Sequence, residues 1–100
     1  MDAEVVVDRK GGHVVVRARG EFDVASAVAL APALREAYDA DCDVDLDLRD
    51  TTFCDVTFLR ILIDAQERLN LAGHQLQVLH PPPVLLRMIS ALHIDQLEIA

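Results

Sequence analysis

The chain has 100 residues, of which 52% are hydrophobic and only 4% aromatic, which suits one small domain with an aliphatic core. Its formal net charge of −8 opposes binding to nucleic acid phosphates and anionic lipid surfaces. No apolar run approaches the roughly eighteen residues that a membrane span needs, and the N-terminus is acidic where a signal peptide would be basic. We therefore expect a single cytoplasmic domain over residues 1–100, without direct membrane insertion.

Two β-branched segments open the chain, "AEVVVD" and "HVVVRARG", and Gly11-Gly12 between them predicts a β-hairpin. The next segment has the spacing of a helix, which Asp23 or Ser26 could cap. Its apolar face consists of Ala27, Leu30, Ala31, Leu34 and Tyr38. Because Pro32 would remove a backbone hydrogen bond inside a helix, we expect a kink there or a regular helix that begins close to it.

The segment "CDVDLDL" alternates strictly between aspartate and apolar residues, which predicts a half-buried strand. "RDTTFC" follows as a loop. A second helix is predicted from its apolar spacing and ends near Gly73, a residue type common just beyond helix C-termini. Its core-facing residues are Leu59, Leu62, Ile63, Gln66 and Leu69.

A further strand, "HQLQVLH", precedes "PPP", which stops the strand and supplies a proline for a helix start. The third helix has the apolar face Val84, Leu85, Met88, Ile89 and Leu92, and "DQLEIA" could form a last short strand. The predicted fold is therefore α/β, in the order β-β-α-β-α-β-α-(β), with a mixed sheet of four to five strands and three main helices. The acidic alternation indicates that one sheet face is incompletely covered.

The sequence indicates no catalytic, metal or cofactor site. None of the four histidines stands beside a nucleophile and an acid in a known arrangement, and no glycine-rich phosphate loop occurs. Cys42 and Cys54 are interpreted as reduced apolar residues. The aspartates from Asp39 to Asp50 superficially match a calcium loop, but Val44 occupies the position that requires glycine. We therefore expect a non-enzymatic protein.

The start of the second helix, within "TTFCDVTFLRIL", is the candidate functional site. A helix start that follows a central strand is where open α/β sheets usually place functional groups, and its free N–H groups stabilise an anion. Asp55 could supply that anion as a helix cap, or a phosphate on a nearby hydroxyl could. Phe58, Ile61 and Ala65 form a second apolar row, which is either buried or faces a partner.

Two stretches, "GEFDVASAVAL" and "VDLDLRDTTFCDVTFLRIL", resemble the STAS domain family, specifically the anti-sigma factor antagonists of bacterial partner-switching systems. The first is similar to the family's Gly-Glu-Leu-Asp, and the second to its Asp-Ser-Ser/Thr-Gly-Leu helix start. The resemblance implies a STAS fold and binding to an anti-sigma factor that is also a serine kinase. In the family, phosphorylation of the serine after the aspartate breaks this complex, and the unphosphorylated antagonist frees the sigma factor.

By position, Asp55 and Leu59 match the family's aspartate and leucine, whereas Val56 replaces the phosphorylated serine and Phe58 the glycine. Thr57 matches the second hydroxyl position. Three readings follow: Thr57 is the acceptor, with Thr51 and Thr52 as weaker candidates; no phosphate is added and Val56 with Phe58 form an apolar docking surface; or the partner has changed. The second is preferred, because a hydroxyl is removed while the apolar row is enlarged, so we expect docking through residues 54–62 without the usual serine phosphorylation switch.

The resemblance leads us to expect a partner-binding surface made by Asp55, Val56, Thr57, Phe58, Ile61 and Ala65. The partner would be an anti-sigma factor of the kinase fold. The alternative is an accessory subunit of a membrane transport complex of the ABC type, and a homodimer through the apolar row also stays open.

Overall fold

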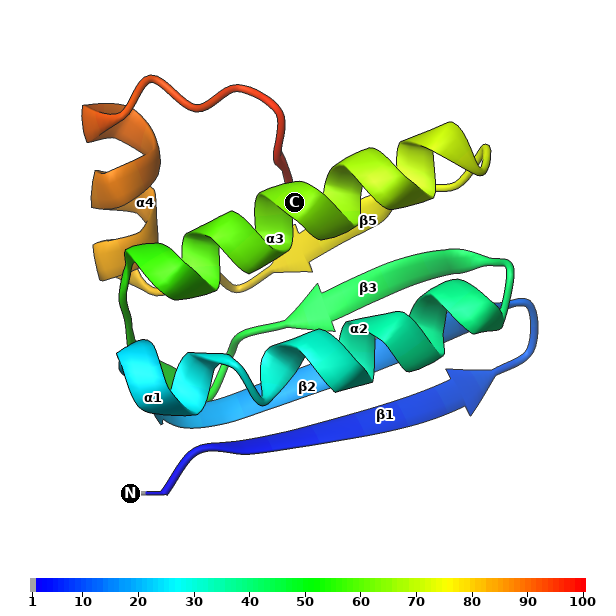
Figure 1. Ribbon diagram of the computed structural model, residues 1–100, viewed down its shortest axis with the longest axis horizontal. Helices are drawn as coiled ribbons and strands as arrows, with labels where there is room; N and C mark the ends of the chain where they lie inside the picture. The colour runs from blue at the N-terminus through cyan, green and yellow to red at the C-terminus, as the bar shows by residue number, and fades with distance from the viewer. Residues whose placement is uncertain (1) are drawn as a thin grey trace.

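The computed structural model describes residues 2–100, which form a mixed sheet with helices (Figure 1). The predicted order is confirmed, although the first helix is divided and one strand was not expected. The strands are β1 (Glu4–Lys10), β2 (His13–Phe22), β3 (Asp43–Asp47), β4 (Thr51–Cys54), β5 (Leu76–Leu79) and β6 (Glu98–Ile99). The helices are α1 (Val24–Ala27), α2 (Leu30–Asp39), α3 (Val56–Leu71) and α4 (Pro83–Ala91).

The sheet runs in the order β1-β2-β3-β5-β6. β1 and β2 form the predicted antiparallel hairpin, and the later neighbours are parallel, as expected for strands joined by helical crossovers. Of the segment predicted as a loop, Arg49 and Asp50 form a turn, and the remaining four residues are instead the strand β4. It pairs in parallel with the end of β2, where Phe22 is aligned with Cys54. β2 is long enough to pair with β3 along its first half and with β4 at its end.

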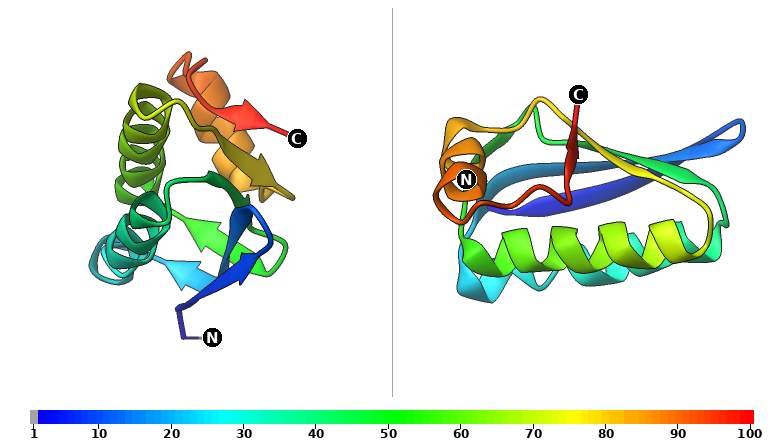
Figure 2. Two further views of the ribbon diagram at one scale, coloured as in Figure 1. Left: turned by 90° about the vertical axis from the view of Figure 1, so that its right-hand side faces the viewer. Right: turned by 90° about the horizontal axis from the view of Figure 1, so that it is seen from above.

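Helices α2 and α3 lie side by side on one face of the sheet, and α4 lies at one end (Figures 1 and 2). The core between these layers is aliphatic, as predicted, and includes Val44, Leu46 and Leu48 of the β3 region. On the opposite sheet face Asp43 is exposed, and Asp45 and Asp47 are half-buried. The alternation of "DVDLDL" therefore corresponds to one covered and one open face, as the sequence indicated.

The division of the first helix follows from Pro32. Asp23 caps α1, and its carboxylate accepts a hydrogen bond from the Ser26 backbone N–H while the Ser26 hydroxyl accepts one from the Asp23 N–H. The backbone then restarts as α2 at Leu30, which puts Pro32 in the first turn. The first four N–H groups of a helix have no intrahelical partner, so the proline removes no helical bond there.

Gly20 in β2 cannot be replaced without distortion. Its φ is +98°, and a Cβ atom built there would lie 2.6 Å from the Asp2 carbonyl oxygen. The Gly20 N–H donates to the Asp50 carbonyl oxygen at 2.9 Å, just before β4 begins. This glycine thus lets the end of β2 turn toward β4, and so helps to position the start of α3.

Candidate protein-docking site at the start of α3

The start of α3 is fixed to the end of the sheet. β4 runs directly into Asp55, whose N–H donates to the carbonyl oxygen of Phe22 at 3.1 Å. The ends of β2 and β4 therefore meet where both α1 and α3 begin. In Figures 1 and 2, α1, the first turn of α3 and α4 lie at this same end of the molecule.

Asp55 is the N-cap of α3, as the sequence predicted. Its backbone is extended, and its Oδ1 atom accepts hydrogen bonds from the N–H groups of Thr57 at 3.0 Å and Phe58 at 3.2 Å. The carboxylate thus occupies the position at which free N–H groups and the helix dipole stabilise a negative charge. An anion on a neighbouring residue would lie in the same positive field of the helix N-terminus as the Asp55 carboxylate.

The expected exposed row on α3 is not formed. Phe58 and Ala65 are fully buried, and only Ile61 of that row is partly accessible. The Phe58 ring packs on Phe22, with ring centroids 5.1 Å apart and an interplanar angle of 53°. The wide apolar arc of α3 is therefore buried on two sides, and Phe58 and Ala65 are core residues, not docking residues. Phe22 stands where the Gly-Glu-Leu-Asp motif has leucine, and Phe58 stands where the helix-start motif has glycine.

Val56, by contrast, is 40% exposed. It lies in the first turn of α3. The helices α1 and α3 contact each other, and α1 with its C-cap carries two more exposed valines, Val24 and Val28. Phe53 precedes the cap and is also exposed. We call Val24, Val28, Phe53 and Val56 the apolar end surface. These four exposed hydrophobic side chains come from segments that meet at one end of the sheet, and only Val56 among them was expected from the sequence.

The three candidate hydroxyl groups differ in accessibility. Thr51 is buried, and its hydroxyl donates to the Ala18 carbonyl oxygen at 2.6 Å. The Thr52 hydroxyl donates to the Gly20 carbonyl oxygen at 3.2 Å. Thr57 is half-buried, and within residues 2–100 no hydrogen bond engages its hydroxyl. Thr52 is the most exposed of the three, Thr57 is the one whose hydroxyl has no hydrogen bond within residues 2–100, and Thr51 is bound inside the fold.

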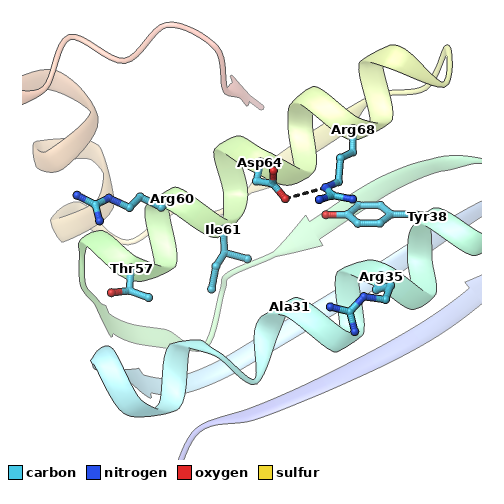
Figure 3. Close-up of a pocket in the computed structure, with 8 residues that line it drawn as sticks. All are labelled: Ala31, Arg35, Tyr38, Thr57, Arg60, Ile61, Asp64 and Arg68. Atoms are coloured by element: carbon cyan, nitrogen blue, oxygen red, sulfur yellow. Dashed lines mark hydrogen bonds and ion pairs between the residues drawn. The ribbon is translucent and has the colours of Figure 1, made fainter.

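A groove of about 380 Å³ runs between α2 and α3, beside Thr57 (Figure 3). It is lined by Ala31, Arg35, Tyr38, Thr57, Arg60, Ile61, Asp64 and Arg68. Nε of Arg68 donates to Asp64 at 2.9 Å, and its guanidinium lies 6.0 Å from the centre of the Tyr38 ring. Burial, followed by the nearby Asp64 charge, raises the pKa of Tyr38, so this phenol stays protonated at neutral pH.

The groove was not predicted from the sequence. The only signal was the spacing of Ala31, Arg35 and Tyr38 along α2, and of Thr57, Ile61, Asp64 and Arg68 along α3. Each set lies on one helical face. Nothing in the sequence shows that the two faces meet.

The histidines form no catalytic arrangement in the part of the chain that the structure describes. His74 lies 2.9 Å from Asp41 and 3.5 Å from Asp43, and His13 lies 3.4 Å from Asp45, on the open side of the molecule. His80 contacts Arg49 at 3.0 Å. Across residues 2–100, no group of three or more His, Cys, Asp or Glu residues is arranged to hold a metal ion.

The cysteines Cys42 and Cys54 are not joined in a disulfide. Cys54, directly before the cap, is fully buried. This burial, followed by the Asp55 charge, raises the pKa of its thiol to about 11. A thiol in this state is a weak nucleophile at neutral pH, because the thiolate is the reactive form.

Comparisons with known proteins agree with this architecture. An anti-sigma factor antagonist from Mycobacterium paratuberculosis superposes with a TM-score of 0.82 and 24% identity, covering 98% of this chain and 85% of that one. SpoIIAA in its unphosphorylated form gives a TM-score of 0.76 and 15% identity, covering 97% and 87% of the two chains. The phosphorylated form of the Bacillus SpoIIAA gives 0.76 and 14%, covering 97% and 91%. At these identities the likeness establishes the fold.

A search of curated protein sequences found no match. Within residues 2–100, no helix is long and apolar enough to cross a membrane. A family model described as "Mlab, STAS domain" matches residues 5–99. STAS domains of this kind are non-enzymatic regulatory modules. The chain therefore belongs to the STAS domain family.

Proposed function

We propose that this STAS domain is a protein-binding regulatory module that acts as an anti-sigma factor antagonist. Its partner would be an anti-sigma factor of the kinase fold, and the contact would centre on Asp55, Val56 and Thr57 at the start of α3. Ile61, which lies further along the same helix and is partly accessible, extends the surface. The cytoplasmic location expected from the sequence belongs to this proposal.

The observation that carries the proposal is the contrast between Val56 and Phe58. Phe58 is buried in the core against Phe22, which anchors the first turn of α3 to the core. Val56 is exposed in that turn, at the end of the sheet where α1 carries two further exposed valines. Exposed apolar side chains grouped on a fixed scaffold are typical of a protein-docking surface.

The apolar end surface also supports docking that is not controlled by phosphorylation of a serine. Val56 has no hydroxyl, and burying its side chain against a partner would add hydrophobic stabilisation. A phosphate on Thr57 remains the alternative, because that hydroxyl is free of hydrogen bonds within residues 2–100 and lies in the first helical turn. Such a phosphate would place about two negative charges close to Asp55 and would weaken docking by repulsion and desolvation.

The experiment is an affinity capture from the native cell extract, with mass spectrometry of the bound proteins and of phosphate on the bait. Val56→Asp should abolish recovery of the anti-sigma factor, because it places a charge in an apolar contact. The matched control is Leu71→Asp at the far end of α3, where the side chain is 90% exposed; it should bind like the wild type. Equal binding by both variants would exclude this surface, and phosphate at Thr57 would show that a switch is retained.

A second candidate is an accessory subunit of a membrane transport complex, docked by the same surface. The apolar Val56 favours it, because a permanent subunit contact needs no reversible phosphorylation. The same affinity capture distinguishes the two candidates. The accessory-subunit function predicts recovery of transport ATPase subunits in place of an anti-sigma factor. Loss of that complex in Val56→Asp would then assign the same docking residues to a different partner.

A further inference from the structure

The groove between α2 and α3 differs in charge from the chain as a whole. The protein has 17 acidic and 9 basic residues, yet the groove is lined by three arginines and a single acid, Asp64. Arg68 is paired with that acid. Among residues 2–100, Arg35 and Arg60 form no ion pair. Two guanidinium groups are thus left without a carboxylate along one groove.

The groove also offers apolar contact. The side chains of Ala31 and Ile61 line it between the arginines, and Tyr38 with Arg68 lies toward its far end (Figure 3). At its other end the groove reaches Thr57, and it is therefore continuous with the start of α3. A partner bound at that helix start would be adjacent to the groove.

We propose that this groove receives an acidic segment of the docked partner protein, in which carboxylates pair with Arg35 and Arg60 and an apolar side chain contacts Ile61. The inference rests on the proposed function, since it extends the same docking surface along α2 and α3. The groove thereby selects partners by charge, whereas the apolar end surface supplies hydrophobic contact.

Charge complementarity favours a protein segment over a nucleic acid. A phosphate backbone would meet the field of a chain with a net charge of −8. A short acidic segment needs to approach only the groove, where arginine can bind each carboxylate through two N–H groups. The same overall charge would disfavour acidic segments on the acidic open face of the sheet, where Asp43, Asp45 and Asp47 lie.

The test uses the isotopically labelled full chain and NMR titration with a short acetylated peptide of alternating glutamate and leucine. A second peptide, with glutamine in place of glutamate, isolates the charge. The acidic peptide should shift the amide signals of the groove residues, and the glutamine peptide should not. Raising the salt concentration should weaken the binding, because exposed ion pairs are screened.

The variant Arg35→Gln/Arg60→Gln should bind the acidic peptide about three- to tenfold more weakly, as expected for the loss of two exposed ion pairs. The matched control is Arg9→Gln/Arg87→Gln, which removes the same charge from exposed arginines outside the groove and should leave the affinity unchanged. Equal losses in both variants would mean unspecific charge attraction. Equal binding of both peptides, or no groove shifts, would likewise overturn the proposal.

Val56→Asp distinguishes this inference from the proposed function. The variant should lose partner capture and yet bind the acidic peptide as the wild type does, because Val56 does not line the groove. If the peptide binds normally but no anti-sigma factor is captured by the wild type, the proposed partner fails and the groove assignment stands. If capture succeeds and the peptide leaves the groove signals unmoved, only the groove assignment fails.

Discussion

The helices α1 and α3 begin with the same two residues, an aspartate cap followed by valine, but the two starts are stabilised differently. Asp23 and Ser26 bond to each other in a reciprocal capping box, and α1 is only four residues long. Asp55 accepts two backbone N–H groups without such a box, and α3 continues for sixteen residues. Val24 is 67% exposed and Val56 is 40% exposed.

The difference lies in what each first turn buries. In α1, Ala27 is the only buried residue, so this short helix depends on its cap. In α3, Phe58 and Leu59 are both buried in the first turn, and the helix is fixed by packing. A first turn that is stabilised by its core residues can expose other positions, such as Val56, for recognition without loss of that stabilisation.

The largest expected effect comes from removing the packing that fixes α3. Phe58→Ala should lower the free energy of unfolding by about 3–5 kcal/mol, because it deletes a buried ring and leaves a cavity beside Phe22. A domain of this size has only about 5–15 kcal/mol in total. Urea unfolding followed by circular dichroism measures the change.

The control for that prediction is Phe53→Ala, which removes an exposed ring from the same end of the molecule. Its unfolding free energy should stay within about 0.5 kcal/mol of the wild type. A Phe58→Ala protein as stable as this control would contradict the placement of Phe58 in the core.

A smaller effect is expected from the caps. Asp55→Ala should cost about 1 kcal/mol, because it leaves two N–H groups of α3 without their acceptor. Asp23→Ala should lower global stability less than Asp55→Ala does and mainly loosen α1, which contributes little burial. Urea unfolding measures the global change and amide hydrogen exchange the local one. A larger global loss for Asp23→Ala would refute the contrast between the two starts.

The Asp23 cap of α1 also predicts that the stability of the folded chain depends on pH. The hydrogen bond from the Ser26 backbone N–H, followed by that from its hydroxyl, lowers the pKa of Asp23 below its ordinary value of 3.8. The ionised form is therefore favoured in the folded chain. Its stabilising contribution is present above pH 3.8 and is lost as the pH falls through the lowered pKa. NMR titration of the Asp23 carboxyl should give a midpoint below 3.8.

The smallest expected effect concerns the reactivity of the two cysteine thiols. A pKa of about 11 for Cys54, against an ordinary value of 9.0, reduces its thiolate roughly hundredfold at neutral pH. A thiol reagent should thus label the half-buried Cys42 well before Cys54. The neutral buried thiol favours the folded chain below pH 9, and this contribution is lost as the pH rises from 9 through 11. Equal labelling rates in the native protein would mean that β4 opens readily.

The element order and the Asp55 cap were predictable, since they depend on residues close together in sequence. The strand β4 was not, because its four residues show no apolar alternation and become a strand only by pairing with the distant end of β2. The sequence also decides only in part which residue could accept a phosphate. The sequence shows that Val56 has no hydroxyl, but Thr51 is excluded only by the structure, in which its buried hydroxyl contacts Ala18.

The sequence by itself determined the alternation of strands and helices, the aliphatic core, the acidic open face and the missing serine, because periodicity and composition act locally. Only the tertiary structure decided which side chains of α3 are accessible. A wide apolar arc fits burial on two sides as well as exposure to a partner, and the packing of Phe58 on Phe22 selects burial. The groove, with Arg35 and Arg60 free of ion pairs among residues 2–100, depends in the same way on α2 and α3 lying side by side, which is a long-range contact that no local pattern encodes.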